Sequence, residues 1–134
     1  MKNIGDSEAL VLFVEQYPLC MPCGDVPNFV SPFTCNPNCY KILAENDDWI
    51  TGLLEVKPGE MDDLHHHKDH LIYVLEGDEV TIYPDGNLDD PHPVPIKPEM
   101  GVPAPMSAGP IFNHHRVKNT GTVTAKMLFF EMKK

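Results

Sequence analysis

Short apolar runs separated by turn residues dominate the chain after residue 48. Residues 49–56 form one such run, and Lys57-Pro58-Gly59-Glu60 behind it is a turn signal. Residues 70–83 form the longest run, which is interrupted at 76–78 and ended by Pro84-Asp85-Gly86-Asn87. Runs of this length, bounded by Gly, Pro, Asn and Asp, predict β-strands, because helical patterns extend over about ten residues or more.

Further short strands are predicted towards both ends of the chain. We expect a strand at 94–97 and a final hairpin in which 116–119 and 123–131 join through a turn. Phe129 shares a face with residues 123, 125 and 127, and this row is predicted to line the interior. Two more strands are expected, one at 9–14 and one at 39–43. Many short strands at even spacing predict an all-β sandwich or barrel.

The first 48 residues differ from the rest in their content of Cys and Pro. They hold all four Cys and several punctuating prolines, so long helices are not expected there. We predict an irregular Cys/Pro-rich arm at 1–48 that packs on a β-barrel at 49–134. The total of 134 residues fits one domain.

Composition and charge narrow the choice of partners. The chain has 10 Lys plus Arg against 20 Asp plus Glu, which gives a formal net charge of −10. This acidic balance argues against nucleic acid and anionic membranes as partners. No apolar run approaches the roughly 20 residues of a membrane span, and no signal peptide is evident at the start. We expect a cytoplasmic protein.

Six of the seven His fall in two clusters. In the first, His65 and His67 share one face of a strand and His66 points the other way. His70 follows Lys68-Asp69, and a turn at those two residues forms a hairpin that aims His65, His67 and His70 at one point. The other interpretation of this cluster is a solvated His-rich hairpin.

The second cluster lies on a strand with opposite faces of different character. Arg116 and Lys118 mark one face as solvent-facing, so His115 points inward together with Val117 and Asn119. A buried polar group needs a partner. Inward His residues from two distant strands suit a divalent transition metal, because neutral imidazole binds zinc, iron, copper and nickel alike. The alternative is a core histidine that is satisfied by hydrogen bonds.

These residues resemble the two motifs of the cupin superfamily. The first family motif is G-x5-H-x-H-x3,4-E-x6-G, and the second is G-x5-P-x-G-x2-H-x3-N. The first corresponds to Gly59, His65, His67, His70 and Gly77, and the second to Pro110, His115 and Asn119. His70 stands where the family usually has Glu, and Ala104 and Phe112 replace the two Gly of the second motif. The resemblance spans about residues 50 to 131.

The resemblance implies a monocupin, that is, a double-stranded β-helix or jelly-roll barrel with one divalent metal. It implies His65, His67, His70 and His115 as ligands. The alternatives are that the arm supplies another ligand, or that His70 stands behind a ligand and does not touch the metal. Four neutral ligands leave the dication uncompensated, which favours an anionic substrate. Iron, manganese or nickel suits a site with open positions, whereas zinc more often closes at four ligands. The resemblance also implies a homodimer.

The cysteines form a separate pattern. Cys20 and Cys23 with Cys35 and Cys39 have the spacing C-x2-C-x11-C-x3-C, which is compatible with a structural zinc. Disulfides and free thiols are the alternatives.

The function expected from the sequence is that of a small metal-dependent enzyme acting on an anionic small molecule. Dioxygenase, lyase and isomerase reactions all occur in cupins, so the reaction type stays open. The alternative is a non-catalytic barrel that binds or senses a small ligand.

Overall fold

The structure is a computed structural model that describes residues 2–9, 11, 13–14, 27–68, 70–98, 104–106 and 114–133. The strand expected at 9–14 is wrong for the residues described there, since 9, 11, 13 and 14 lie in no strand. Among the described residues, no helix has the length and apolar character needed to cross a membrane.

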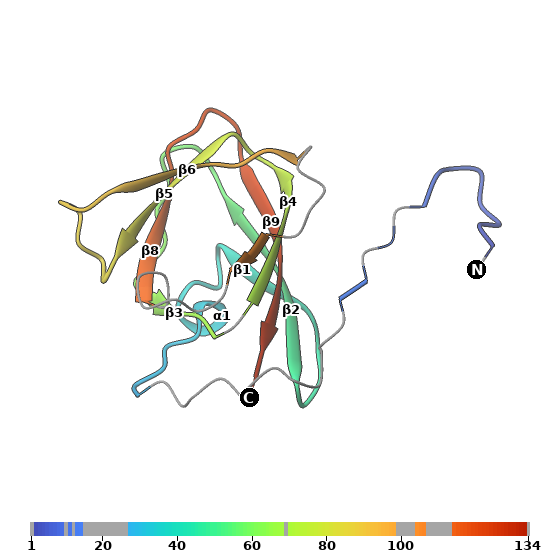
Figure 1. Cartoon of the computed structure of the whole chain (residues 1–134), viewed down its shortest axis with the longest axis horizontal. Helices are drawn as coiled ribbons and strands as arrows, with labels where there is room; N and C mark the ends of the chain where they lie inside the picture. Colours follow the sequence, from blue (N-terminus) through green and yellow to red (C-terminus); the bar gives the residue numbers. More distant parts are fainter. Residues whose placement is uncertain are drawn as a thin grey trace.

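Two antiparallel sheets face each other around the core, which confirms the all-β fold class (Figure 1). The first sheet has the order β1 (Tyr40–Glu45), β2 (Trp49–Val56), β9 (Ala125–Met132), β4 (His70–Glu76) and β7 (Ala104–Met106). The second has the order β3 (His65–His66), β8 (His114–Asn119), β5 (Glu79–Pro84) and β6 (His92–Pro95). A one-turn helix, α1 (Pro32–Cys35), precedes β1.

Alternation along the strands builds the core between the sheets. In β9, Ala125, Met127 and Phe129 are buried and the residues between them are half-exposed, as expected from a period of two. The predicted interior row is therefore confirmed for these three residues but is wrong for Val123, which is 41% exposed. Val117 of β8 belongs to the same cluster from the opposite sheet.

The strands that precede and follow residues 120–124 do not form the expected hairpin. β8 pairs with β3 and β5, whereas β9 pairs with β2 and β4, so the connection crosses from one sheet to the other. Asn119 holds this crossing: its buried amide donates to the carbonyls of Val56 and Val123, both at 2.8 Å, and accepts from the Gly121 N–H. Each strand has one apolar face, and crossing lets the two faces pack against each other.

The same correction applies to the histidine hairpin. β3 ends at His66 and β4 begins at His70, and the two strands lie in different sheets. The first His cluster therefore spans a junction of two sheets. Other predicted strands are close to the structure: β2 has the predicted bounds, β1 begins one residue later than predicted, and β6 lies two residues before the expected 94–97.

Candidate metal centre

Strand register places the buried polar residues opposite one another in each sheet. In the smaller sheet, His65 of β3 is the direct partner of His115 in β8. In the larger sheet, His70 of β4 is the direct partner of Glu131 in β9. His67 lies on the connection between β3 and β4, so it stands between the two pairs. All five side chains are buried.

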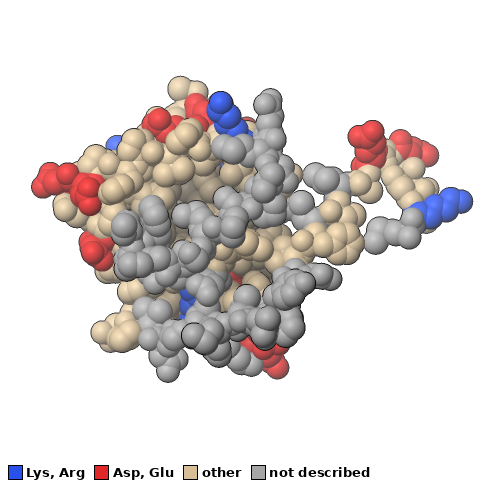
Figure 2. All heavy atoms as spheres, viewed as in Figure 1, with Lys and Arg blue, Asp and Glu red and all other residues tan. Residues whose placement is uncertain are grey.

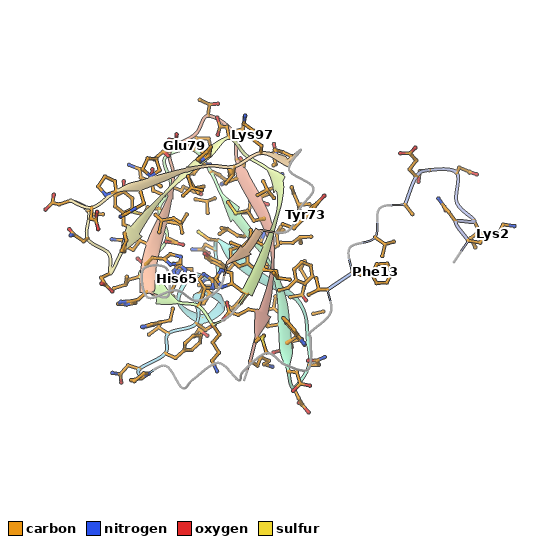
Figure 3. The ribbon with its side chains drawn as sticks, in the orientation of Figure 1. Lys2, Phe13, His65, Tyr73, Glu79 and Lys97 are labelled. Carbon is orange, nitrogen blue, oxygen red and sulfur yellow. The ribbon has the colours of Figure 1, made fainter. Side chains whose placement is uncertain are left out.

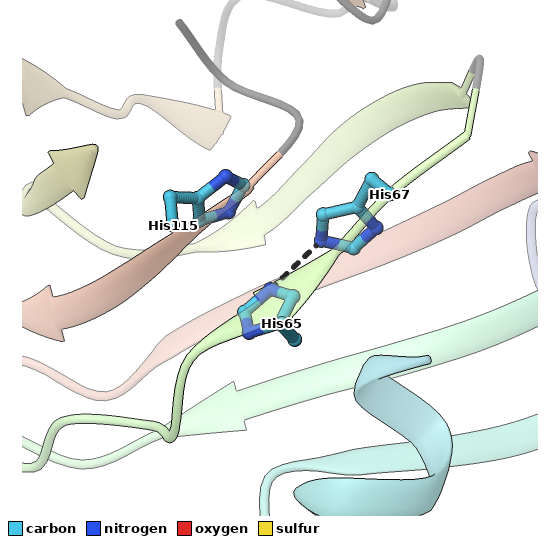
Figure 4. A group of neighbouring side chains, drawn as sticks. All are labelled: His65, His67 and His115. Atoms are coloured by element: carbon cyan, nitrogen blue, oxygen red, sulfur yellow. Dashed lines mark hydrogen bonds between the residues drawn. The ribbon is translucent and has the colours of Figure 1, made fainter. Parts of the chain in front are cut away.

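The inward histidines converge, as Figure 4 shows for His65, His67 and His115. The Nε2 atoms of His65 and His67 are 3.0 Å apart. One ligand atom from each of His65, His67 and His115 lies within 4.8 Å of the others, and the same holds for His67, His70 and Glu131. His70 thus falls in a group with Glu131 rather than with His65 and His115, and His67 is common to both groups.

In three of these histidines, the Nδ1 atom of the ring lies beside a hydrogen-bond acceptor. Nδ1 of His65 is 2.8 Å from the Asp63 carbonyl oxygen, and Nδ1 of His70 is 2.7 Å from that of Lys68. Nδ1 of His67 is 2.6 Å from Oε2 of Glu131. A proton on Nδ1 leaves the Nε2 lone pair available, and such partners fix the ring of a metal-binding histidine in this tautomer.

Burial keeps the imidazoles of His65 and His67 neutral, which is the form that binds metals. Desolvation lowers the pKa of His65 to about 4 and that of His67 well below its usual 6.5. If both rings carry the proton on Nδ1, two lone pairs face each other across 3.0 Å, an arrangement that a shared cation stabilises. The donor set of three imidazoles and a nearby carboxylate therefore fits a divalent transition metal.

Glu131 changes the charge balance that the sequence suggested. The four-histidine interpretation leaves a dication without a negative neighbour, but the structure places a carboxyl group 2.6 Å from His67. This group is 3% exposed, and burial raises its pKa to about 8. In the absence of a cation the proton can reside on Glu131; a cation at His67 favours the carboxylate, which then compensates half of the charge.

Tyr40 and Asp62 complete the buried surroundings. The Tyr40 hydroxyl lies 3.3 Å from both Asp62 Oδ2 and His65 Nε2. Asp62 Oδ1 accepts the backbone N–H of Val117 at 2.6 Å, which ties the carboxyl group to β8. Desolvation raises the pKa of Asp62 to about 7 and that of Tyr40 well above 10. The hydroxyl is thus a protonated donor held beside the histidines.

The sequence interpretation missed Tyr40, Asp62 and Glu131. Glu131 had a usable signal, because it continues the inward row of Met127 and Phe129 on the same strand. Tyr40 begins β1, the edge strand of the larger sheet, within the segment assigned to the arm. Asp62 lies outside the regular strands, and its role depends on a tertiary bond to Val117.

The outer histidines are separate from this centre. His66 and His114 stack on each other on the opposite face of β3 and β8, with ring centroids 4.1 Å apart and planes at 14°. His66 Nδ1 accepts the backbone N–H of Val30 at 3.2 Å, and His114 Nδ1 is 3.0 Å from Asp85 Oδ1. Both rings stay outside the buried cluster, as the alternation of faces predicts.

The cysteine pattern is only partly described. Cys20 and Cys23 lie outside the described residues, and within the described part of the chain Cys35 and Cys39 form no disulfide. Burial raises the pKa of both thiols, and Cys35 Sγ accepts from the Asn36 amide at 3.1 Å. A structural zinc at the four cysteines stays a prediction.

A cavity of about 170 Å³ opens beside the inner histidines. Tyr40, His67, His70 and His115 contribute to its wall, and most of the remaining lining is aliphatic. The confirmed interior residues Met127 and Phe129 also line it. The histidines therefore lie in the wall of a space that a small molecule can enter.

The chain has the double-stranded β-helix fold of the cupin superfamily, as solved structures show. A cupin domain from Bordetella pertussis Tohama I superposes with a TM-score of 0.59 at 14% identity, over 71% of this chain and 92% of that one. A double-stranded β-helix protein from Klebsiella pneumoniae gives 0.52 at 17% identity, over 69% and 74%. A cupin superfamily protein from Desulfitobacterium hafniense gives 0.50 at 22% identity, over 71% and 76%. No protein-family model and no curated protein matches the chain.

Proposed function

We propose that the protein is a metal-dependent enzyme that acts on an anionic small molecule by dioxygenase, lyase or isomerase chemistry. The observation that supports this is the convergence of buried histidines from two sheets beside a cavity. In the proposal His65, His67 and His115 hold one Fe, Mn, Ni or Zn ion, and His70 lies beside it in the group that it forms with His67 and Glu131. When bound, such an ion supplies Lewis-acid activation of a substrate oxygen.

The surrounding side chains have defined tasks in this proposal. The Tyr40 hydroxyl donates its single proton to Asp62 Oδ2, and in the proposal it redirects this hydrogen bond to a substrate oxygen that enters beside His65. Glu131 accepts a hydrogen bond from the Nδ1–H of His67 and so orients that ring. The aliphatic walls exclude water, which strengthens each of these hydrogen bonds.

The alternative is a barrel that binds or senses a ligand without turnover. A catalyst of proton transfer needs a titratable group within hydrogen-bond reach of the reacting atoms. Tyr40 lines the cavity, and Glu131 lies directly behind His67. The presence of these buried groups favours the enzyme over the binding module.

Elemental analysis of protein purified without chelator or affinity metal tests the site. We expect about one ion per chain in the wild type, a loss of most of it in His115→Ala, and retention in His114→Ala. His114 is the matched control because it directly precedes His115 on β8 and faces outward. Equal metal content in wild type and His115→Ala, with both folded by circular dichroism, contradicts the assignment.

Turnover is tested separately on metal-loaded protein. Small carboxylates and enolisable ketoacids are offered, with dioxygen uptake and proton NMR distinguishing oxidation, elimination and isomerisation. Wild type is expected to convert at least one of them, and Tyr40→Phe to convert it more slowly with unchanged metal content. Tight binding without conversion by any variant supports the non-catalytic alternative.

A further inference from the structure

The cavity is polar at one end and apolar along the rest of its length. On three strands that border the cavity, β4 and β9 of the larger sheet and β8 of the smaller sheet, the inward position beside the proposed metal centre is polar and the next inward positions are apolar. On β4 His70 is followed by Ile72 and Val74, and on β8 His115 is followed by Val117. On β9 Glu131 is preceded by Phe129 and Met127.

β5, the neighbour of β8 in the smaller sheet, continues this apolar wall. Val80 and Ile82 of β5 line the cavity, and Ile82 is the direct partner of Val117. Four residues of strand, as from His70 to Val74, span about 13 Å. The apolar section is therefore longer than the polar end, and its described lining offers few groups that could bond a ligand hydroxyl.

The size of the cavity sets the size of its occupant. Its volume of about 170 Å³ exceeds slightly the roughly 150 Å³ of an apolar cavity that stays dry and accepts benzene. One six-membered ring or a short branched chain fills such a space. Each hydroxyl carried into it would lose its bonds to water, which weakens binding about 5- to 150-fold.

Lys97 is the one permanently charged side chain among the described residues that line the cavity. It is exposed, and Figure 3 shows it at the edge of the barrel, well away from His65. Acidic side chains lie mainly around the outline of the barrel in the view of Figure 2, and the chain carries a net charge of −10. A cation at the rim reduces the repulsion that an anionic ligand meets on entry.

We propose that the ligand of this site is a compact hydrocarbon carboxylate or enolate, with its anionic head at the histidines and a single-ring-sized apolar body between β4, β5, β8 and β9. Polyhydroxylated acids and sugars are excluded by the apolar section, and very small acids gain nothing from it. This inference rests on the proposed function for the position of the head. The apolar body of the ligand is inferred from the cavity alone.

A matched pair of ligands tests the apolar body on metal-loaded wild type. Cyclohexanecarboxylate and quinate share a ring and a carboxylate, but quinate carries hydroxyl groups on the ring. Isothermal titration is expected to give cyclohexanecarboxylate at least 100-fold tighter binding than quinate, and acetate is expected to bind as weakly as quinate. Equal or tighter binding of quinate overturns the inference while leaving a metal enzyme in place.

A neutral probe tests the apolar section of the cavity independently of the metal centre. Toluene added to metal-free protein is expected to shift the methyl NMR signals of Val80, Ile82 and Val117, since no anionic head is needed for this contact. The isosteric Val117→Thr is expected to weaken toluene binding several-fold, whereas Val123→Thr on the exposed turn leaves it unchanged. Absence of the wild-type shifts overturns the apolar body. Shifts in a protein that fails to bind metal keep it and reject the proposed function.

Discussion

Two histidine pairs lie next to each other on the same two strands and differ only in the face they occupy. His65 and His115 are partners on the inner face of β3 and β8, and His66 and His114 are partners on the outer face. The inner pair is buried among polar partners beside a cavity. The outer pair is half-exposed and stacked, with its Nδ1 atoms near Val30 and Asp85.

This difference shows that residue type alone does not make a ligand. The inner His65 has its Nδ1 beside the Asp63 carbonyl oxygen and its pKa lowered by burial, so the lone pair of its other ring nitrogen is available in a dry site. His66 uses its Nδ1 to hold the backbone at Val30. The alternation of inward and outward positions along a strand therefore decides which histidines can bind a metal.

The largest expected effect separates His65→Ala from His66→Ala. Structural zinc sites gain about 10–16 kcal/mol from four ligands, so loss of one ligand costs roughly 3 kcal/mol, or more than a hundredfold in affinity. Equilibrium dialysis with Co²⁺ is expected to show this loss in His65→Ala and wild-type affinity in His66→Ala. A similar loss in both variants would remove the distinction between the faces.

The carboxylates beside the two pairs should differ in their effect on stability. Asp62 has its pKa raised from 3.8 to about 7, so between these values the folded protein retains a proton that the unfolded chain has lost. The contribution of Asp62 to the stability of the metal-free protein therefore falls as pH rises from about 4 to 7, by at most about 1.4 kcal/mol per pH unit, and is constant above. Urea unfolding across this range is expected to show that the stability of wild type relative to Asp62→Asn falls as pH rises.

Asp85→Asn is the matched control for that measurement. Asp85 contacts the outer His114, and its side chain is 83% exposed. The slope of stability against pH is expected to be unchanged in this variant. An equal change of slope in both variants would show that burial is not the cause.

Glu131→Gln tests the charge behind the inner cluster. The amide keeps the size of the side chain but removes the negative charge beside His67, and loss of such a partner typically lowers metal affinity about 10- to 100-fold. Competition with a chelator of known affinity measures it. Glu76→Gln, which removes an exposed ion pair with Lys126, is expected to leave metal affinity unchanged.

The smallest effect concerns the outer pair alone. His66→Ala loses the bond to the Val30 N–H and the stack on His114, which costs about 0.5–1.5 kcal/mol of unfolding free energy. Thermal unfolding at constant metal content measures this. His92→Ala removes a mostly exposed contact with Asp90 and is expected to change nothing measurable.

The strands themselves were predictable because their pattern is local. β2 has the predicted bounds, and the inward row Ala125, Met127 and Phe129 follows from alternation. The pairing was not predictable in the same way. Adjacent strands usually form hairpins, and nothing in residues 120–124 reveals that Asn119 anchors a crossing between sheets.

The candidate site shows the same division. Parity placed His65, His67 and His115 inward, and the structure brings them together. Tyr40 and Asp62 could not be placed, because their positions depend on contacts across 22 residues to each other and 55 residues to Val117. Glu131 could have been found by extending the row of Phe129 by two residues.

The crossing of the chain between β3 and β4 gives the site a mechanical property. Its ligand candidates belong to both sheets, His65 and His115 to one and His70 and Glu131 to the other, with His67 on the link. The distances between these side chains therefore depend on the separation of the two sheets. A core substitution far from the histidines that spreads the sheets by a fraction of an ångström would lengthen these distances before it changed the fold.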